Sequence, residues 1–393
     1  MEAAGIEPAQ NFNRRGDPTI ARSGEVASLG GYAKISSDDS YVRRSGATAN
    51  EPTGNPMLRL EQLQPSDHEW KRMDMFQDRV IFQTREWIEF LAAVSGGEPV
   101  FAAVKDGSDP VGYFSGLAMR RFGMPMLGSP LPGWSTRYLG FNLRAEVPRR
   151  DAVEALMRFA FDDRGSLHVE LRDRHLVAED VRALGLDYTI RPILEVDLRP
   201  SEEEILARMT SASRRCVRKA EKVGVTIEEA HDLGFADDYW AQLREVFGRQ
   251  GLVPPFKLER VKQLIHHVAP TGRLLLLRAR DPAGKCIATG IYPAMNRTMY
   301  FWGGASSRQD QILRPNEAVM WYAMRYWKAR GMDTCDLGGT FPPYKVKYGP
   351  LEVPVVSVRA SRYRTLSRMR NLVRRGYRAR QRISGGLARR RMR

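Results

Sequence analysis

The sequence has no long apolar segment and no visible export signal. None of its apolar runs approaches the roughly 18 residues that a membrane-spanning helix needs, and the longest, near residues 90–94 and 274–277, have the size of core elements. The start of the chain carries Glu2 and Glu7 and lacks a basic stretch followed by an apolar one. We therefore expect no membrane-spanning segment and a cytoplasmic protein.

Cysteine is also scarce. The 3 cysteines, Cys216, Cys286 and Cys335, are odd in number and widely spaced, and no CxxC pattern occurs. This excludes a disulfide scaffold and a zinc ribbon, and favours reduced thiols buried as small apolar side chains. His266 and His267 are neighbours on a predicted helix, so their rings point about 100° apart and cannot readily share a metal. We predict no metal site.

Acidic residues are missing from one region. Residues 361–393 contain 13 Arg and no acid, which leaves 49 basic and 46 acidic groups in residues 1–360 out of a net charge of +16. This tail also holds four apolar residues at helical spacing, Leu366, Met369, Val373 and Tyr377. Such a tail suits RNA or an anionic lipid surface, and a solvated tail is the simpler alternative. Residues 1–55, rich in Gly, Ser, Ala and Asn, are expected to be disordered.

The rest of the chain repeats one order of elements: hairpin, strand, loop, helix, strand. The first copy has expected strands at 100–104, 111–119, 124–127 and 167–171 and a helix at 151–162. The second copy has expected strands at 274–280, 287–293, 298–302 and 334–337, a loop at 303–315 and a helix at 316–330. We predict an α/β (α+β) protein with two domains, residues 56–190 and 191–360.

The second copy is preceded by a strand and several helices. The strand covers residues 193–198, and Ser201 with Glu204 forms a capping box that opens a helix. A basic helical stretch at 213–222 follows, then a strand at 225–228 and two amphipathic helices at 237–249 and 258–268.

Four segments of the second half carry a family likeness. They are the basic stretch 213–224, the strand-turn-strand 274–293, the helix start Arg314-Pro315-Asn316, and Asp336-Leu337-Gly338-Gly339 followed by Tyr344-Lys345-Val346-Lys347-Tyr348-Gly349. They resemble the GNAT superfamily of acyltransferases, and within it the tandem-GNAT branch that includes Fem-type aminoacyltransferases. The first half resembles this branch by element order. The likeness implies two GNAT-like domains, each a mixed, mostly antiparallel sheet flanked by helices, with the acceptor held by the first and the donor and the chemistry by the second.

The likeness also implies catalytic candidates at the end of the second half: Asp336, Lys345, Lys347 and Tyr348. The two lysines, charged at neutral pH, could stabilise an anionic tetrahedral centre. Asp336 could take the proton of an amine if its pKa were raised, or serve as a hydrogen-bonded structural anchor. Tyr348 keeps the aromatic character of the family's ending, whereas Leu337 stands where relatives usually have Phe.

The likeness also implies that the predicted strands 298–302 and 334–337 splay apart and that the acyl donor lies in the slot between them. Gly303 and Gly304 would let the backbone approach a ligand, or would simply form a turn. The positive end of the helix beginning at Asn316, with Arg308 and Arg314, would stabilise phosphates. The loop lacks the Gly-rich pattern of ordinary acetyl-CoA users, which favours aminoacyl-tRNA and leaves acyl-CoA open.

Two further sets of side chains are candidates for substrate contact. Basic residues at Arg214, Arg215, Arg218, Lys219 and Lys222 form one broad helix face that could follow an RNA phosphate backbone, with a solvated face as the alternative. Trp134 and Arg137 in the first half are candidates for the acceptor, and a turn with a packed Trp is the alternative.

We therefore predict an acyltransferase that forms an amide bond on an amine of a cell-envelope precursor or sugar nucleotide. No cofactor is expected to be tightly bound, and acyl-CoA or aminoacyl-tRNA is the co-substrate. The expected location is cytoplasmic, with peripheral contact to an anionic membrane through residues 361–393 as an option. The alternative is a non-catalytic GNAT-like scaffold that docks on RNA or a membrane through the same tail.

Overall fold

The computed structural model describes residues 57–121, 123–339 and 342–363. The predicted disordered segment 1–55 and the Arg-rich tail from residue 364 onward lie outside these residues.

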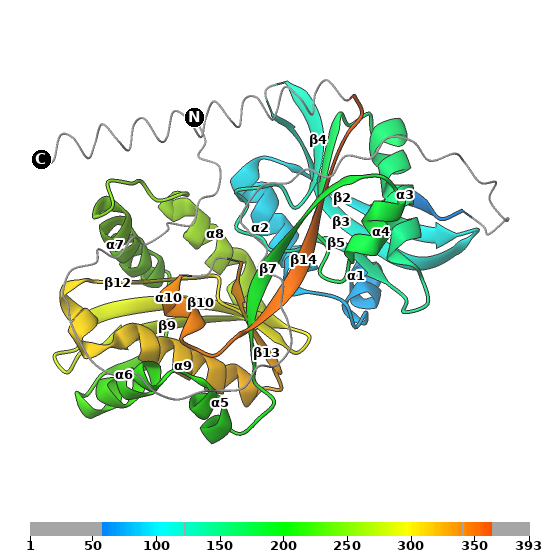
Figure 1. The fold of residues 1–393 in the computed structure, drawn as a ribbon. Helices are drawn as coiled ribbons and strands as arrows, with labels where there is room; N and C mark the ends of the chain where they lie inside the picture. Colours follow the sequence, from blue (N-terminus) through cyan, green and yellow to red (C-terminus); the bar gives the residue numbers. More distant parts are fainter. Residues whose placement is uncertain (1–56, 122, 340–341, 364–393) are drawn as a thin grey trace, which may run out of the picture. The chain divides into compact units, whose positions relative to one another are not determined.

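The strands of the described part join in one large sheet that is flanked by helices (Figure 1). Its order is β1-β2-β3-β4-β6-β14-β7-β13-β11-β10-β9-β8, with β5 paired to β3 and β12 paired to β10. The pairs β4–β6 and β11–β13 are parallel, and the other pairs are antiparallel. The predicted mixed α/β fold class is confirmed. The strands are β1 Arg59–Leu63, β2 Glu98–Asp106, β3 Asp109–Arg121, β4 Met124–Ser129, β5 Gly140–Leu143, β6 His168–Leu171, β7 Asp187–Asp197, β8 Thr226–Glu229, β9 Leu274–Arg280, β10 Cys286–Met295, β11 Thr298–Tyr300, β12 Gly303–Ser306, β13 Thr334–Gly338 and β14 Leu351–Ser361.

The predicted helices begin and end near the expected positions, and four further helices, at 67–74, 85–95, 178–183 and 343–346, were not predicted. Ser201 caps its helix as expected, because its Oγ accepts from the Glu204 N–H while the Glu204 carboxylate accepts from the Ser201 N–H. No helix among the described residues is long and apolar enough to cross a membrane. The helices are α1 Asp67–Asp74, α2 Arg85–Ser95, α3 Arg149–Arg158, α4 Ala178–Ala183, α5 Glu202–Arg208, α6 Ser211–Lys222, α7 Gly234–Gly248, α8 Leu258–Val268, α9 Pro315–Lys328 and α10 Pro343–Val346.

The two halves have the same strand pairing. In the first half, β3 pairs with both β4 and β5, and β4 runs parallel to β6 after α3. In the second half, β10 pairs with both β11 and β12, and β11 runs parallel to β13 after α9. The repeat predicted from element order is therefore present in the pairing of the strands.

One expectation needs correction. The segment 303–315, expected to be a loop, begins with strand β12 and continues into a 3-10 helix at Gln309–Leu313. The residues of β12 are small and do not alternate between apolar and polar, so they carry no strand periodicity. The backbone pairing with β10 is what makes this segment a strand.

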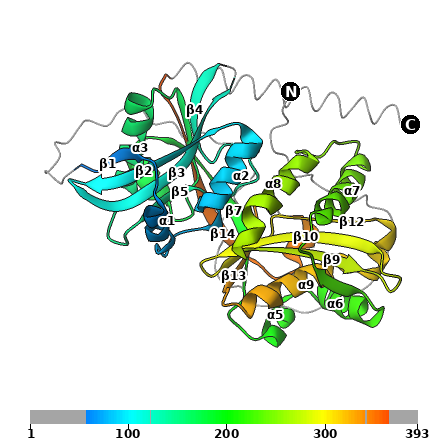
Figure 2. The ribbon, with the colours of Figure 1, turned by 180° about the vertical axis from the view of Figure 1, so that it is seen from behind.

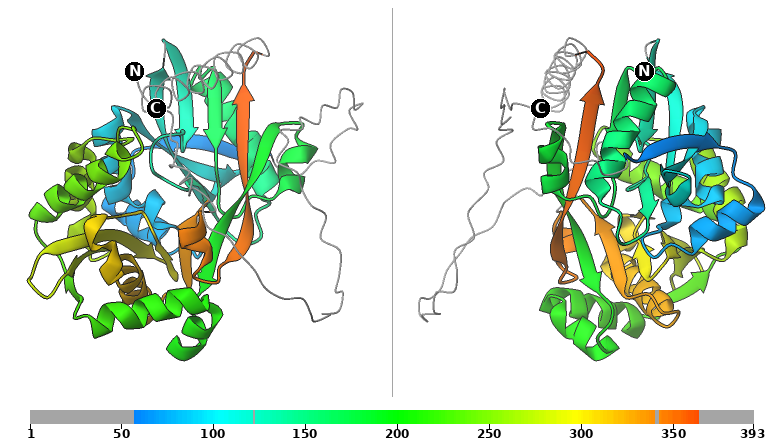
Figure 3. Two further views of the ribbon diagram at one scale, coloured as in Figure 1. Left: turned by 60° about the vertical axis from the view of Figure 1, so that its left-hand side comes forward. Right: turned by 90° about the vertical axis from the view of Figure 1, so that its right-hand side faces the viewer.

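The long strands β7 and β14 join the halves at the centre of the sheet (Figure 3). β14 pairs with β7 over Leu351–Arg359 and with β6 over Val358–Ser361, while β7 also pairs with β13. The predicted boundary between residues 190 and 191 falls inside β7. The division into two domains stays a prediction.

Alternation along β9 shows how the second half is layered. Leu275 and Leu277 pack with the core residues of α5, α6 and α9, such as Val217. Leu276, which points to the other face, packs with those of α7 and α8, such as Val261. From behind, α7 and α8 lie on the opposite side of β9 and β10 from α9 (Figure 2). Helices therefore cover both faces of β9 and β10.

Candidate active site

The strands β11 and β13 run together and then part. They pair from Thr298 opposite Thr334 to Tyr300 opposite Asp336, and the Phe301 N–H donates to the Asp336 carbonyl at 2.9 Å. The chain then turns to β10 and continues as β12. We call the point just after β11, where the chain leaves β13, the fork. Backbone groups beyond it have lost their strand partner and need another.

The two glycines after the fork are explained by packing inside the protein. A Cβ on Gly303 would lie 2.5 Å from Tyr239 Oη, and one on Gly304 would lie 3.0 Å from the Phe301 ring. Gly303 therefore leaves no room for a larger residue, and Gly304 leaves little, even without a ligand. Their predicted role in donor binding remains a proposal.

A buried carboxylate lies at the fork. Asp336 is 1% exposed, and its Oδ1 accepts the Gly338 N–H at 2.7 Å while its Oδ2 accepts the Tyr138 hydroxyl at 3.0 Å. Burial, and then the charge of Asp336, raise the pKa of Tyr138 well above its ordinary value. The Tyr138 hydroxyl therefore stays protonated and donates.

Arg137 of the first half also reaches the fork. Its Nη2 donates to the Phe301 carbonyl at 2.5 Å, and its Nε lies 3.5 Å from Asp336 Oδ1. Arg137, an acceptor candidate of the first half, thus forms an ion pair with Asp336, a catalytic candidate of the second half. The loop that carries Arg137 therefore brings the halves together at the fork.

A second carboxylate, which sequence reasoning missed, faces the same cluster. Glu195 of β7 lies directly opposite Asp336 of β13, so both side chains are on one face of the sheet. Arg174 Nη2 donates to Glu195 Oε1 at 2.6 Å. Burial raises the pKa of Glu195 above its usual range, although Arg174 acts in the opposite direction. A carboxylate with a raised pKa is suited to accept a proton.

The three catalytic candidates around α10 have different environments. Lys345 is 1% exposed, and its Nζ lies 5.9 Å from the centre of the Phe301 ring, beside the fork. Lys347 Nζ instead forms an ion pair with Glu317 Oε1 of α9 at 2.5 Å. Tyr348 is buried in the core, and burial raises its pKa well above the ordinary value. Of the three, Lys345 is therefore the one whose amine lies beside the fork.

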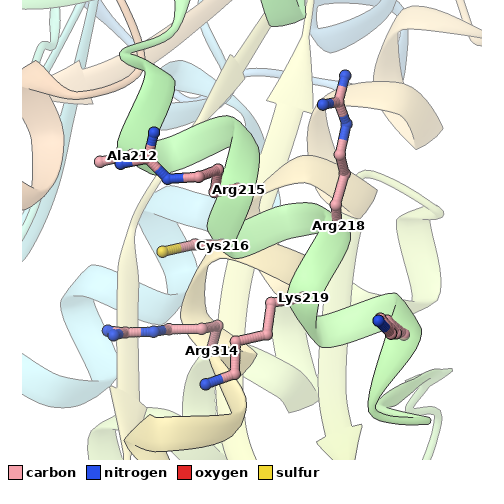
Figure 4. Close-up of a pocket in the computed structure, with 7 residues that line it drawn as sticks. Ala212, Arg215, Cys216, Arg218, Lys219 and Arg314 are labelled. Atoms are coloured by element: carbon pink, nitrogen blue, oxygen red, sulfur yellow. The ribbon is translucent and has the colours of Figure 1, made fainter.

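A basic pocket of about 570 Å³ lies between α6 and the turn before α9 (Figure 4). Figure 4 shows the side chains of Lys219 and Arg314 extending in the same direction, while Arg218 extends away from them. The pocket combines one predicted donor residue with four of the five residues predicted to contact phosphate. Its lining residues are Ala212, Arg215, Cys216, Arg218, Lys219, Lys222 and Arg314.

The cationic side chains of this pocket have no anionic partner in the described part of the chain. None of the five forms an ion pair or a side-chain hydrogen bond with a described residue. Among the described residues, no ion pair links these cations to a carboxylate on a neighbouring turn of α6. Like charges gathered around one hollow produce a positive potential that attracts a phosphate or another anion.

The remaining predicted phosphate and donor residues have structural contacts. Arg214 Nη1 donates to the Ala207 carbonyl at 3.0 Å, at the end of α5. Asn316 Nδ2 donates to Ser306 Oγ at 2.9 Å, which holds the start of α9 against β12. The Arg308 side chain is exposed, and its backbone N–H donates to a carboxylate of α7.

The comparisons with known proteins agree with this architecture. Residues 207–346 match the family model described as an acetyltransferase (GNAT) domain. Among curated proteins, none matches the sequence. The chain is similar in structure to FemX, with a TM-score of 0.64 and 13% identity over 79% of this chain and 99% of FemX.

Two other solved structures are also similar. One is a conserved protein of unknown function from Bacteroides thetaiotaomicron, with a TM-score of 0.53 and 10% identity over 77% of this chain and 100% of that one. The other is a tandem GNAT protein from the clavulanic acid biosynthesis pathway, with a TM-score of 0.47 and 12% identity over 77% of this chain and 98% of that one.

Residues 207–346 form a GNAT acetyltransferase domain, and the described part of the chain has a FemX-like fold. The resemblance that the sequence predicted is confirmed by the domain match and by the FemX-like architecture. The GNAT domain includes the basic pocket, Asp336 and Lys345, and it supports an acyl or aminoacyl transferase activity.

Outside the GNAT domain, the first half contributes Trp134, Arg137 and Tyr138. Trp134 is 2% exposed, and its ring packs so closely on Gly128 that a Cβ there would lie 2.9 Å away. An acceptor would therefore reach little of the Trp134 ring. Sequence reasoning missed Tyr138, because its hydrogen-bond partner, Asp336, lies 198 residues later in the sequence.

Proposed function

We propose that this protein transfers an acyl or aminoacyl group from a phosphate-bearing donor to an amine, forming an amide. The observation that carries the proposal is the basic pocket, whose five cationic side chains have no anionic partner among the described residues, in the same GNAT domain as the fork. A phosphate group neutralises such a pocket, and arginine binds phosphate through paired hydrogen bonds.

The strand β12 connects the two parts of the proposed site. It starts at the fork and ends at Ser306, which holds Asn316 two residues from Arg314 of the pocket. Four strand residues span about 13 Å. A donor with its phosphates in the pocket would therefore lie along β12 and bring its acyl group to the fork. Both acyl-CoA and aminoacyl-tRNA carry a phosphate and an acyl group in one molecule.

The residues at the fork are suited to the chemistry of amide formation. The amine nitrogen would attack the acyl carbon, and the bond to the donor's sulfur or oxygen would break as the new C–N bond forms. Lys345 would stabilise the negative charge that develops on the carbonyl oxygen. Glu195 or Asp336 would accept the proton that the amine loses, which then passes to the leaving group.

The acceptor in this proposal is an amine of a cell-envelope precursor or a sugar nucleotide. Arg137 supports it, because the first half places this cation next to the reacting centre. Precursors of both kinds carry phosphate or carboxylate groups that a guanidinium binds.

Donor binding tests the proposal. Acetyl-CoA and an aminoacyl-tRNA are each titrated against the full chain and against the double variant R215A/R314A, and the melting temperature is measured. The genuine donor is expected to raise the melting temperature of the wild type. The double variant should bind it at least about tenfold more weakly, because a hydrogen bond to a charged group contributes about 1.5–3 kcal/mol.

A matched control removes the same charge elsewhere. Arg59 and Arg144 are exposed and lie outside the GNAT domain, so R59A/R144A should bind the donor like the wild type. Equal weakening in both double variants would show that net charge is responsible, not the pocket. The proposal is wrong if neither donor binds the wild type.

A further inference from the structure

A segment of the first half lies across the fork of the second. Residues 133–138, which we call the strap, are tied to the second half by backbone carbonyls. Trp302 Nε1 donates to the Ser135 carbonyl at 2.9 Å, and Arg260 Nη1 donates to the Gly133 carbonyl at 3.0 Å. Ser135 has a φ of 55°, a left-handed conformation that is unfavourable for a residue with a side chain.

The guanidinium of the strap occupies the space where the strands part. Arg137 Nη2 donates to Phe301 at the end of β11, and Arg137 Nη1 lies 2.0 Å from where a Cβ of Gly338 would be at the end of β13. The side chain thus spans the fork from one strand to the other. It donates a hydrogen bond to the Phe301 carbonyl, which loses its strand partner where the strands separate.

We propose that Arg137 fills the fork in the free chain and withdraws when an anionic acceptor binds, so that acceptor binding opens the fork to the donor. This inference rests on the proposed function. It makes Arg137 a positioning residue that couples the first half to the donor site. It also assigns the acceptor to a chemical class: an amine that carries a phosphate or carboxylate group close to its nitrogen.

The cost of withdrawing Arg137 is limited by the partners that remain. Asp336 keeps one donor on each oxygen, the Tyr138 hydroxyl and the Gly338 N–H. The Phe301 carbonyl could accept an amide N–H from an extended donor, as an unpaired strand edge does. Arg137 itself is 17% exposed in its side chain, so solvent and an acceptor can reach it.

An anionic group is the partner that competes best for this guanidinium. The bond to Phe301 is made to a neutral carbonyl, and the contact with Asp336 is 3.5 Å long. A phosphate or carboxylate would offer this guanidinium two charged hydrogen bonds, which are stronger than these two contacts. Since coupling between two sites is reciprocal, bound donor would also strengthen acceptor binding.

Donor affinity without acceptor tests the inference. Acetyl-CoA and an aminoacyl-tRNA are titrated calorimetrically into the wild-type chain and into R137A. The variant lacks the side chain that competes for the fork, so it should bind the donor about tenfold more tightly. A merely structural role of Arg137 would give equal or weaker binding. R144A, which removes an exposed arginine of the same half, should leave the affinity unchanged.

A second variant keeps the test decisive if R137A does not fold. W302F retains an aromatic ring and loses the bond from Nε1 to the strap, so it should tighten donor binding by a smaller factor. If the wild type binds a donor and neither variant gains affinity, the coupling is wrong and the proposed function stands. If no protein binds either donor, both are wrong.

Discussion

At Gly338, both the backbone conformation and the neighbouring Arg137 side chain require a glycine. Its φ of +89° suits glycine, and a Cβ would lie 2.0 Å from Arg137 Nη1. Gly331 has a similar φ of +84° but open space around the position of its Cβ. A comparison of substitutions at the two glycines therefore separates the cost of backbone strain from the cost of displacing Arg137.

We expect G331A to cost about 1 kcal/mol from backbone strain alone. G338A should cost at least about 1 kcal/mol more, because a methyl group forces the guanidinium out of its place. Urea unfolding of both variants measures the difference. Equal losses would mean that Arg137 moves aside freely and does not occupy the fork firmly.

Glu195 makes the proposed chemistry dependent on pH. Its pKa is raised mainly by burial, so below this raised value the carboxyl is protonated and cannot accept a proton from the amine. We expect the rate of transfer to rise with pH through that pKa, and E195Q to remove the rise. The measurement is the initial rate against pH with the donor that the titrations identify. If D336N removes the rise and E195Q keeps it, Asp336 is the base.

Some residues of the site could be predicted from the sequence and others could not. Asp336 and Lys345 could be proposed because each lies in a segment with a family likeness. Glu195 and Arg174 could not, because their place depends on the register between β7 and β13. Which residues face each other across strands distant in sequence is a tertiary property.

Among the elements, β12 and the start of α9 position the basic pocket. Ser306 Oγ, at the end of β12, accepts from Asn316 Nδ2 at 2.9 Å and from Gln311 Nε2 at 3.4 Å. The turn that carries Arg314 lies between these two residues and has a φ of 62° at Arg314 itself. One hydroxyl therefore fixes both sides of that turn.

We expect S306A to weaken donor binding about fivefold, because each lost hydrogen bond contributes about 0.5–1.5 kcal/mol to holding the turn. The neighbouring S307A is the matched control. Ser307 Oγ donates to Glu245 of α7, away from the turn, so its loss should leave donor affinity unchanged. Calorimetric titration compares the two, and equal effects would argue against a fixed turn.

The elements were predictable where periodicity or capping was strong. The second hairpin, the capping box at Ser201 and the helix of the GNAT domain were found from their patterns. One short strand was missed in each half, β5 in the first and β12 in the second. Each is four residues long and is defined by its backbone pairing with a longer strand, which leaves little trace in the sequence.

For the whole molecule, the main alternative to an enzyme is a scaffold that docks through its basic tail. Deleting residues 364–393 removes 12 Arg and no acid, and it leaves every described strand intact. We expect the truncated chain to keep acyl transfer at saturating substrate and to lose affinity for anionic vesicles or RNA in low salt. A full-length chain without transfer activity, whose affinity for vesicles or RNA is lost on truncation, would favour the scaffold.

The architecture as a whole was more accessible from the sequence than the site. The repeated order of elements predicted two similar halves, and their strand pairing is the same. The joining of the halves through β7 and β14 was not predicted, because the last strand pairs with a partner about 160 residues earlier. That long-range pairing is what brings the strap of one half to the fork of the other.

A crystal structure of the full chain with a hydrolysis-resistant acyl donor is the most direct test of the proposed site. We expect a donor phosphate within hydrogen-bonding distance of Arg215, Lys219 or Arg314, and the acyl group at the fork, beside the Phe301 carbonyl and the Asp336 carboxylate. A donor whose phosphate lies outside the basic pocket, or whose acyl group lies away from the fork, would contradict the account.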